Sequence, residues 1–225
     1  VCGPVLAQQT SALRLTIQDG AVVGVENLRT AETYTRPAGP SDSTSALRVW
    51  DRPGMVHDAR PGEDGVGLSC QVSAEGEDLL VRQAGRREAG GVAGVWLGLG
   101  PVDAQAVRIL IPGVGGVILD EDSKVVDCTY YYPGSWGTPA VALQREHGGV
   151  LVTADDPAAS FKALRVTRLA TAWRLLLLTD TDPPYGPRTD CASATWRFTA
   201  YEGPWTVAAD LQRERLQRVF HLTPL

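Results

Sequence analysis

The sequence predicts an all-β protein, a large antiparallel β-sandwich with one α-helix at its C-terminal end. Short apolar or alternating segments recur about every 8–12 residues between turn signals, which is typical of a sandwich or barrel. No segment with helical periodicity lies between them, which argues against α/β architectures. Helical periodicity appears once, after Pro204, where apolar residues recur every three or four positions.

The N-terminal half contains a series of strand candidates. Asp19-Gly20 separates two apolar runs, residues 12–17 and 21–25, and this dipeptide is a strong hairpin signal. A turn and a short strand follow at 27–34, and the Pro-, Gly- and Ser-rich residues 36–45 form a loop. The other candidates of this half are 46–50, 54–57, a hairpin of 66–72 and 78–83, and then 92–99 and 104–111, which Gly100-Pro101 is expected to separate.

The C-terminal half continues the same pattern. Residues 161–169 and 172–179 form the clearest strand pair, and the Pro-rich stretch 180–190 forms a loop. The last strand, at 194–201, alternates polar and apolar residues and is rich in aromatics. The remaining strand candidates are 114–119, 124–132, 140–144 and 150–153.

These elements define the expected domain organisation. We expect residues 11–203 to form the β-sandwich and residues 204–222 to form an exit helix that leads to a further, catalytic domain. Residues 1–10 are interpreted as a signal-peptide remnant or a disordered tail. Val5 and Ala7 stand at the small-residue positions that precede a signal cleavage site, so we expect export to the periplasm or beyond. Only two of the 21 basic residues are lysine, and with abundant Ala and Gly this indicates a GC-rich bacterial genome.

Composition excludes several classes of function. The chain has 225 residues, 44% hydrophobic and 21% charged, which is ordinary for a globular protein. A net charge of −5 argues against a nucleic-acid partner, and no apolar run approaches the roughly 20 residues of a membrane span. The four cysteines are widely spaced without a CxxC pair, so we expect no metal site and no cofactor; their pairing stays open. The simplest interpretation makes Cys70, Cys128 and Cys191 small buried residues on strands.

Sequence motifs for catalysis are weak. Glu146-His147 could support acid–base chemistry, but it stands beside Gly148-Gly149, where a solvated turn is expected. The acidic runs 120–122 and 155–156 are likewise interpreted as solvated turns. The glycine-rich stretch 113–116 lacks the lysine and the helix of a phosphate loop. We therefore expect no catalytic residue within this chain.

An aromatic run at residues 130–136 is the most distinctive stretch. Strand alternation places Tyr130 and Tyr132 on one face and Tyr131 on the other, and Pro133-Gly134 then carries Trp136 into a loop. Exposed aromatics suit sugar rings or a partner domain, because they offer flat apolar area with a polar tip. Two interpretations stay open: Tyr131, Tyr132 and Trp136 bind a ligand, or the rings anchor the core and the loop.

The helix carries a second set of candidates. Trp205 lies in the first turn close to the small Ala208 and Ala209, so we expect its ring to pack on the sheet, with Trp205→Ala costing about 3–5 kcal/mol. The apolar side of the helix extends further toward its C-terminal end than packing on one sheet edge requires. We expect this end of the helix to contact the following domain, and Phe220→Ala to cost far less. The candidate interface residues are Trp205, Leu216, Val219 and Phe220.

Several stretches, in their order along the chain, carry a family resemblance. They are 15–20 with 25–30, 107–113, 132–134 with 140–143 and 148–152, and 203–210. Together they resemble the N-terminal β-domain that precedes the catalytic barrel in bacterial glycoside hydrolases of the α-galactosidase and endo-α-N-acetylgalactosaminidase type. Pro204 replaces the acidic residue that is usual at the start of the exit helix in these domains.

This resemblance implies a fold and a role. The fold is the supersandwich of galactose mutarotase, and the catalytic carboxylates belong to the barrel that follows, so none is transferred to this chain. The first hypothesis is a non-catalytic domain that supports a glycoside hydrolase barrel of the same polypeptide. One alternative is a free-standing carbohydrate-binding or adhesion module. The other is a mutarotase-like sugar epimerase, for which the candidates are His57, His147, Glu146 and Asp127.

Overall fold

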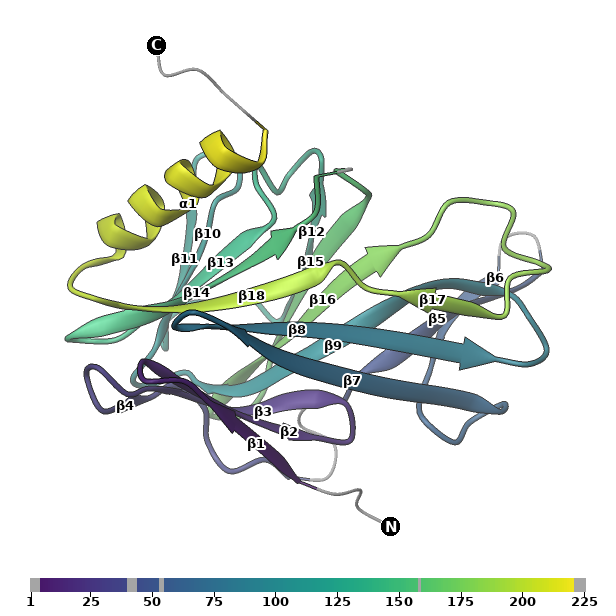
Figure 1. The fold of residues 1–225 in the computed structure, drawn as a ribbon, viewed down its shortest axis with the longest axis horizontal. Coiled ribbons are helices and arrows are strands. Elements are labelled where there is room, and N and C mark those ends of the chain that lie inside the picture. Colours follow the sequence, from purple (N-terminus) through teal and green to yellow (C-terminus); the bar gives the residue numbers. More distant parts are fainter. Residues whose placement is uncertain (1–4, 40–43, 53–54, 158, 221–225) are drawn as a thin grey trace.

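The computed structural model describes residues 5–39, 44–52, 55–157 and 159–220. They form two large β-sheets packed face to face, with one α-helix on the outside of one sheet (Figure 1). The predicted fold class, an all-β sandwich with a C-terminal helix, is confirmed. Cys2, Gly54 and His221, which figure among the sequence-based expectations, lie outside the described residues.

Sheet A has ten strands, in the order β1-β2-β3-β9-β16-β15-β12, with β4 beside β3 and the β5–β6 pair beside β9. Neighbours are antiparallel except for a single parallel bridge between β3 and β9. The strands are β1 (Leu6–Gln9), β2 (Leu13–Gln18), β3 (Ala21–Asn27), β4 (Glu32–Thr33), β5 (Ala46–Arg52), β6 (Met55–Ala59), β9 (Val92–Asp103), β12 (Asp127–Tyr132), β15 (Lys162–Arg168) and β16 (Ala172–Asp180).

Sheet B has eight strands, in the order β11-β10-β13-β14-β18-β8-β17, with β7 beside β8. Its longest hairpin, β7–β8, forms at the predicted place around Gly76. The strands are β7 (Val66–Glu75), β8 (Asp78–Arg87), β10 (Arg108–Ile111), β11 (Val117–Leu119), β13 (Ala140–Gln144), β14 (Gly148–Asp155), β17 (Asp190–Ala192) and β18 (Thr195–Glu202).

The core lies between the two sheets. Strand alternation supplies it, as in β2, where Leu13, Leu15 and Ile17 are buried and the intervening residues are half-buried. Two tryptophans from distant segments, Trp136 and Trp196, are fully buried and stack with ring centroids 6.4 Å apart. Such large rings bury the most apolar area per residue, so they contribute strongly to the stability of the sandwich.

Three details differ from the sequence-based prediction. Residues 6–9 of the expected tail form the edge strand β1, paired along its whole length with β2. Gly100-Pro101 does not break β9, which continues to Asp103 along β16. Gly100 permits this continuation: its φ of +127° is open to glycine, and a Cβ there would lie 2.9 Å from the carbonyl oxygen of Trp173. The short strand β17 was not predicted; it begins at Asp190, the last residue of the predicted loop, and ends before the predicted last strand.

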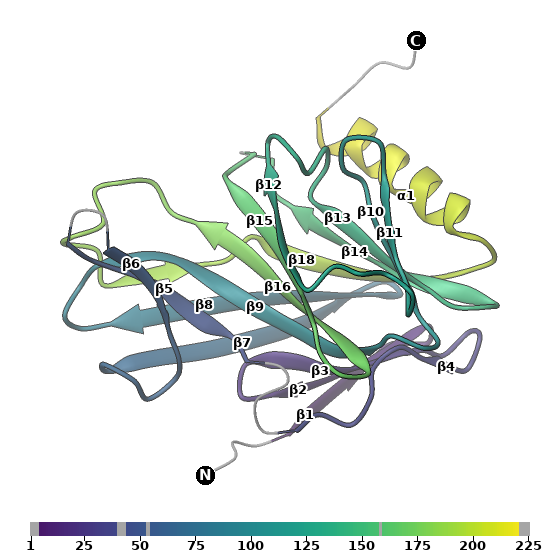
Figure 2. The ribbon, with the colours of Figure 1, turned by 180° about the vertical axis from the view of Figure 1, so that it is seen from behind.

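The helix α1 (Trp205–Val219) packs on the outer face of sheet B, against β13, β14 and β18 (Figures 1 and 2). The predicted helix spans 204–222, so α1 begins one residue after the predicted start and ends three residues before the predicted end. Ala208 is buried against a small cluster on this face; the small side chain lets the helix lie close to the strands. No helix among the described residues is long and apolar enough to cross a membrane.

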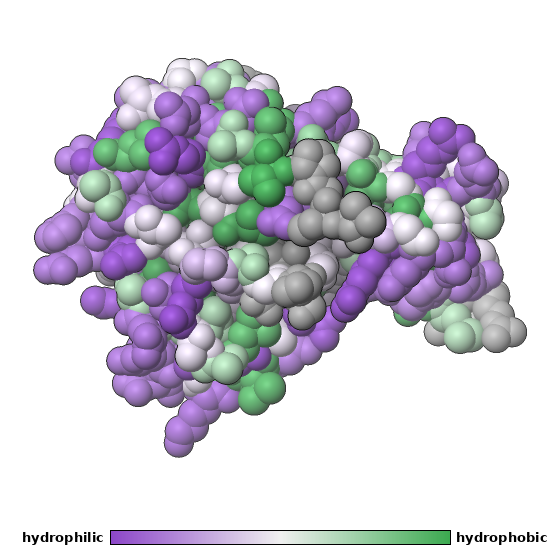
Figure 3. All heavy atoms as spheres, turned by 90° about the horizontal axis from the view of Figure 1, so that it is seen from below, coloured by the Kyte–Doolittle hydropathy of each residue, from purple (hydrophilic) through white to green (hydrophobic). Residues whose placement is uncertain are grey.

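The surface at the bottom of Figure 1 is mainly polar. Figure 3 shows it covered mainly by hydrophilic residues, with apolar residues in separate small groups. Val5 and Leu6, at the N-terminal edge of sheet A, are among the exposed apolar side chains. The broad apolar groove described below lies along the helix, beside sheet B.

Candidate functional site

The candidate acid–base residues of a mutarotase-like epimerase do not lie close together in the structure. His57 lies on β6 with Nδ1 3.3 Å from Asp51, whereas His147 lies at the β13–β14 turn, 4.0 Å from Glu146. Figures 1 and 2 show β6 and this turn at opposite ends of the molecule. Asp127 lies on a third element, β12. Acid–base chemistry needs groups within hydrogen-bonding reach of one substrate, so these residues do not form a shared site.

No group of three His, Cys, Asp or Glu side chains in the described part of the chain is placed to hold a metal ion. Cys70, Cys128 and Cys191 are free thiols on β7, β12 and β17. Their expected positions on strands are confirmed, although each is partly rather than fully buried. Burial raises the pKa of Cys70 to about 11 and that of Cys191 to about 12, so both are protonated, inert thiols at neutral pH.

The acidic run 120–122 forms a turn in which Glu121 and Asp122 are exposed, as predicted. The prediction of a solvated turn is wrong for residues 155–156. Asp155 ends β14 and forms ion pairs with arginines, and Asp156 forms one with the fully buried Lys162. The pairing of β14 with β18 brings Arg197 to Asp155 from 42 positions away, which the local sequence could not indicate.

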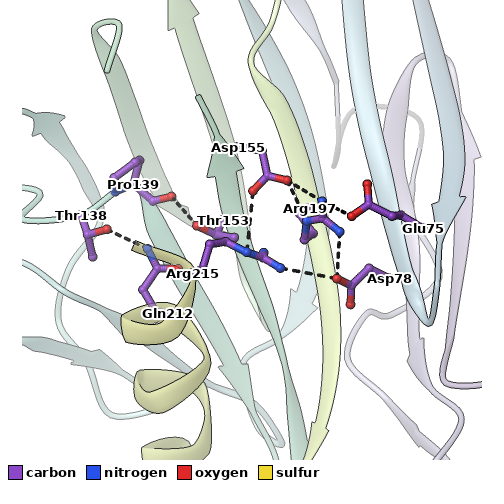
Figure 4. Close-up of polar contacts among 9 residues, drawn as sticks. All are labelled: Glu75, Asp78, Thr138, Pro139, Thr153, Asp155, Arg197, Gln212 and Arg215. Carbon is purple, nitrogen blue, oxygen red and sulfur yellow. Dashed lines mark hydrogen bonds and ion pairs between the residues drawn. The ribbon is translucent and has the colours of Figure 1, made fainter. Parts of the chain in front are cut away.

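Asp155 belongs to an ion-pair network that attaches the helix to sheet B (Figure 4). Arg197 of β18, with only 10% of its side chain exposed, lies 2.7 Å from Asp155, 3.0 Å from Asp78 and 2.9 Å from Glu75. Arg215 of α1 approaches Asp78 at 3.5 Å and Asp155 at 3.7 Å. The two carboxylates shared by both arginines therefore fix the middle of α1 over the sheet.

A hydrogen bond adds to this attachment on the other side of the helix. Gln212 is buried, and its Nε2 donates to Thr138 Oγ1 at 2.9 Å (Figure 4). Ala208 packs one turn earlier on the cluster that includes Leu151 and Tyr201. The predicted packing of the first half of the helix on the β-domain is confirmed, and these contacts hold α1 at a defined distance from β10 and β11.

Between α1 and the β10–β11 hairpin lies an open apolar groove of about 870 Å³. Ile118 on β11 and Trp205 on α1, both in its lining, are 54% and 50% exposed. Other apolar lining residues are Leu110, Val117, Ala142 and Leu216.

The predicted burial of Trp205 against the sheet is wrong. Ala208 makes the close contact with the strands, whereas the Trp205 ring, one turn earlier, lines the groove and stays half-exposed. Leu216 lines the same groove. Val219 and Phe220 line a separate small pocket with Tyr132 at the C-terminal end of α1. Phe220 is partly exposed there. The four interface candidates therefore divide between the groove and this pocket, and Leu216 lines both.

The aromatic candidates on β12 separate into exposed and buried groups. Tyr130 and Tyr132 pack against the core, whereas Tyr131 is exposed on the opposite face, as alternation predicted. Trp136 is fully buried, and its Nε1 donates to the carbonyl of Ala140 at 2.9 Å. It anchors the loop to the core and cannot meet a ligand.

Sequence reasoning missed two sets of residues. Phe161 lies beside Tyr131, with ring centroids 6.0 Å apart, because β12 and β15 pair. The ion pairs of Arg197 and Arg215 likewise depend on elements far apart in the chain. Phe161 could have been noticed as an aromatic residue at the start of a predicted strand. No local sequence pattern indicated that Arg197 and Arg215 form ion pairs.

Comparison with known proteins leaves the family open. No family model matches the sequence, and no curated protein matches it. Among solved structures, the chain is similar to a TPR-domain containing protein from Parabacteroides distasonis ATCC 8503, with a TM-score of 0.42 and 8% identity over 89% of this chain. The match covers 47% of that protein, so this chain spans about half its length. A likeness this weak carries no argument, and the resemblance to glycoside hydrolase β-domains stays a prediction.

Proposed function

We propose that this chain is a non-catalytic β-sandwich domain of a carbohydrate-active enzyme, and that a catalytic domain of the same polypeptide docks along α1. The observation that supports the docking is the apolar groove between α1 and the β10–β11 hairpin. Apolar side chains as large as Trp205 and Ile118 are costly to leave in water, and a contiguous exposed apolar patch is typical of an interaction surface.

The groove is also suited to docking because it is rigid. Arg215 and Gln212 fix α1 from the sheet side through ion pairs and a hydrogen bond. The opposite wall belongs to the hairpin, whose strand β10 pairs with β13 in sheet B. A partner that enters this groove meets a surface held in place beforehand, which reduces the entropy lost on binding.

The position of the groove favours a domain of the same polypeptide. It runs along α1, so a segment that continues from the helix is tethered next to the groove at a high effective concentration. The assignment to carbohydrate-active enzymes, and the galactose mutarotase-like supersandwich fold, are supported by the sequence resemblance. Export from the cell remains a prediction from residues 1–8.

The reading frame and a matched pair of variants test this proposal. We expect the frame to continue beyond Leu225 for the length of a barrel domain. In the complete polypeptide, Ile118→Asp places a charge in the interface and should lower the melting temperature by several degrees. In the isolated 225-residue chain, the same change should cost within about 1 kcal/mol, since Ile118 is exposed there.

Val126→Asp is the matched control, because Val126 is an exposed apolar residue outside the groove. It should have the same small effect in both contexts. A frame that stops near residue 225, or equal effects of Ile118→Asp in both proteins, would contradict the proposal. The first of these outcomes would favour a free-standing module.

A further inference from the structure

Two exposed aromatic rings form a continuous surface on the outer face of sheet A. Tyr131 projects from β12, and Phe161 stands directly before β15; they are 48% and 40% exposed. Their ring centroids lie 6.0 Å apart and their planes are tilted by 31°, so the two rings adjoin one another. We call this pair the aromatic platform. Figure 2 shows β12 and β15 next to one another at the edge of the sheet.

A small buried cluster lies next to Tyr131 on this outer face. Tyr131 stands directly opposite Ala163 in the β12–β15 register, and Ala163 is opposite Leu178 of β16. Both are fully buried with Trp96 of β9, whose Nε1 donates to Asp58 Oδ1 at 2.8 Å.

A fixed polar pair flanks the rings on the same face. Arg165 donates from Nε to Asp127 Oδ1 at 3.0 Å and from Nη2 to Oδ2 at 2.5 Å, and Thr167 Oγ1 donates to the same carboxylate at 3.3 Å. The Arg165 hydrogen bonds hold the pKa of Asp127 below its usual range. Asp127 and Tyr131 share one face of β12, four residues or about 13 Å apart. The pair is half-exposed and has no net charge.

These features together point to one class of ligand. Exposed aromatic rings beside hydrogen-bonding groups match a pyranose ring, which has an apolar C–H face and a polar rim. The carboxylate and the guanidinium compensate one another, which favours a neutral ligand over an acidic one. Two rings are also too small an area for a stable protein interface, which buries about 800 Å² per partner.

We propose that the aromatic platform, with the Arg165–Asp127 pair, is a binding site for a neutral oligosaccharide. The rings stack on the C–H faces of successive sugar units, and the polar pair accepts and donates hydrogen bonds to hydroxyl groups. This site lies on sheet A, away from the groove along α1 on sheet B. It therefore does not rest on the docking proposed above, and it operates in the isolated chain.

Affinity electrophoresis of the 225-residue chain tests the site. The gels contain a β-1,4-glucan, a xylan, a galactan, an α-1,4-glucan or, as the acidic comparison, polygalacturonate. We expect at least one neutral polysaccharide to retard the protein. Tyr131→Ala and Phe161→Ala should each weaken that retardation roughly ten-fold, which corresponds to about 1.4 kcal/mol. Tyr131→Phe keeps the ring and should retain most of the binding.

Trp205→Ala is the matched control, because it removes a half-exposed aromatic from the other sheet. It should leave the retardation unchanged. Thermal denaturation of every variant confirms that the fold persists, which exposed positions allow. Three results would overturn the proposal: no retardation by any neutral polysaccharide, retardation by polygalacturonate alone, or equal effects of Tyr131→Ala and Trp205→Ala.

Discussion

Arg197 of β18 lies 2.7 Å from Asp155 of β14, and this contact is the centre of the network that joins sheet B to α1. The pair is largely shielded from water, since 10% and 24% of the two side chains are exposed. Both oxygens of Asp155 face arginines, because Arg215 of α1 approaches the same carboxylate. A network of this kind specifies where the helix lies on the sheet, in addition to any stability it provides.

Replacing Arg197 should therefore be strongly destabilising. Arg197→Met leaves Asp155 and Asp78 partly buried without their main partner, and the expected loss is about 3–5 kcal/mol of unfolding free energy. Urea denaturation measures it. Arg165→Met, which breaks a half-exposed pair with Asp127, is the control and should cost about 1 kcal/mol or less. Similar losses for the two variants would show that burial of the network contributes little.

The two tryptophans singled out from the sequence should behave in opposite ways. Trp136→Ala removes a fully buried ring that stacks on Trp196, and we expect a loss of about 3–5 kcal/mol. Trp205→Ala removes a half-exposed ring and should cost about 1 kcal/mol or less in the isolated chain. Chemical denaturation of both variants decides the matter. A larger loss at Trp205 would mean that its ring packs on the sheet after all.

Asp180 should make stability depend on pH in an unusual direction. Burial raises its pKa from 3.8 to about 6, against the opposing effect of Arg48, and the charge of Asp58 adds to the increase. The folded protein therefore binds a proton between about pH 6 and pH 4 that the unfolded chain does not bind. This contribution to stability is complete below about pH 4 and is lost as pH rises through about 6.

Asp180→Asn isolates this effect. The unfolding free energy of the wild type minus that of the variant should increase by roughly 2–3 kcal/mol as pH falls from 7.5 to 4. Other carboxyl groups, such as Asp127 and Asp156, have lowered pKa values and act in the opposite direction, but they are common to both proteins. A difference that stays constant across this range would show that Asp180 titrates normally.

Strand alternation accounts for much of what the sequence predicted correctly. It placed Tyr131 on the opposite face of β12 from Tyr130 and Tyr132, because successive side chains on a strand point to opposite faces. The structure adds that Tyr131 is the exposed one. Alternation also located the β15–β16 pair and the β7–β8 hairpin. The change of period after Pro204 located α1 to within a few residues.

The errors concern loops and long-range contacts. Trp136 follows Pro133-Gly134, where no periodicity tells which way a ring points, and the structure inserts it into the core. Asp155 looked like part of a solvated turn because its arginine partners lie 42 and 60 positions further along the chain. The Tyr131–Phe161 pair depends on the pairing of β12 with β15, which single-sequence patterns do not determine.

Hydrogen exchange of α1 and of the β10–β11 hairpin tests the central claim most directly. It is measured by mass spectrometry in the 225-residue chain and in a polypeptide that carries the proposed catalytic domain, with the β7–β8 hairpin as the internal reference. A domain docked in the groove predicts slower exchange of residues 110–118 and 205–217 in the longer polypeptide, and unchanged exchange in β7–β8. Equal exchange of the groove segments in both proteins would contradict the account.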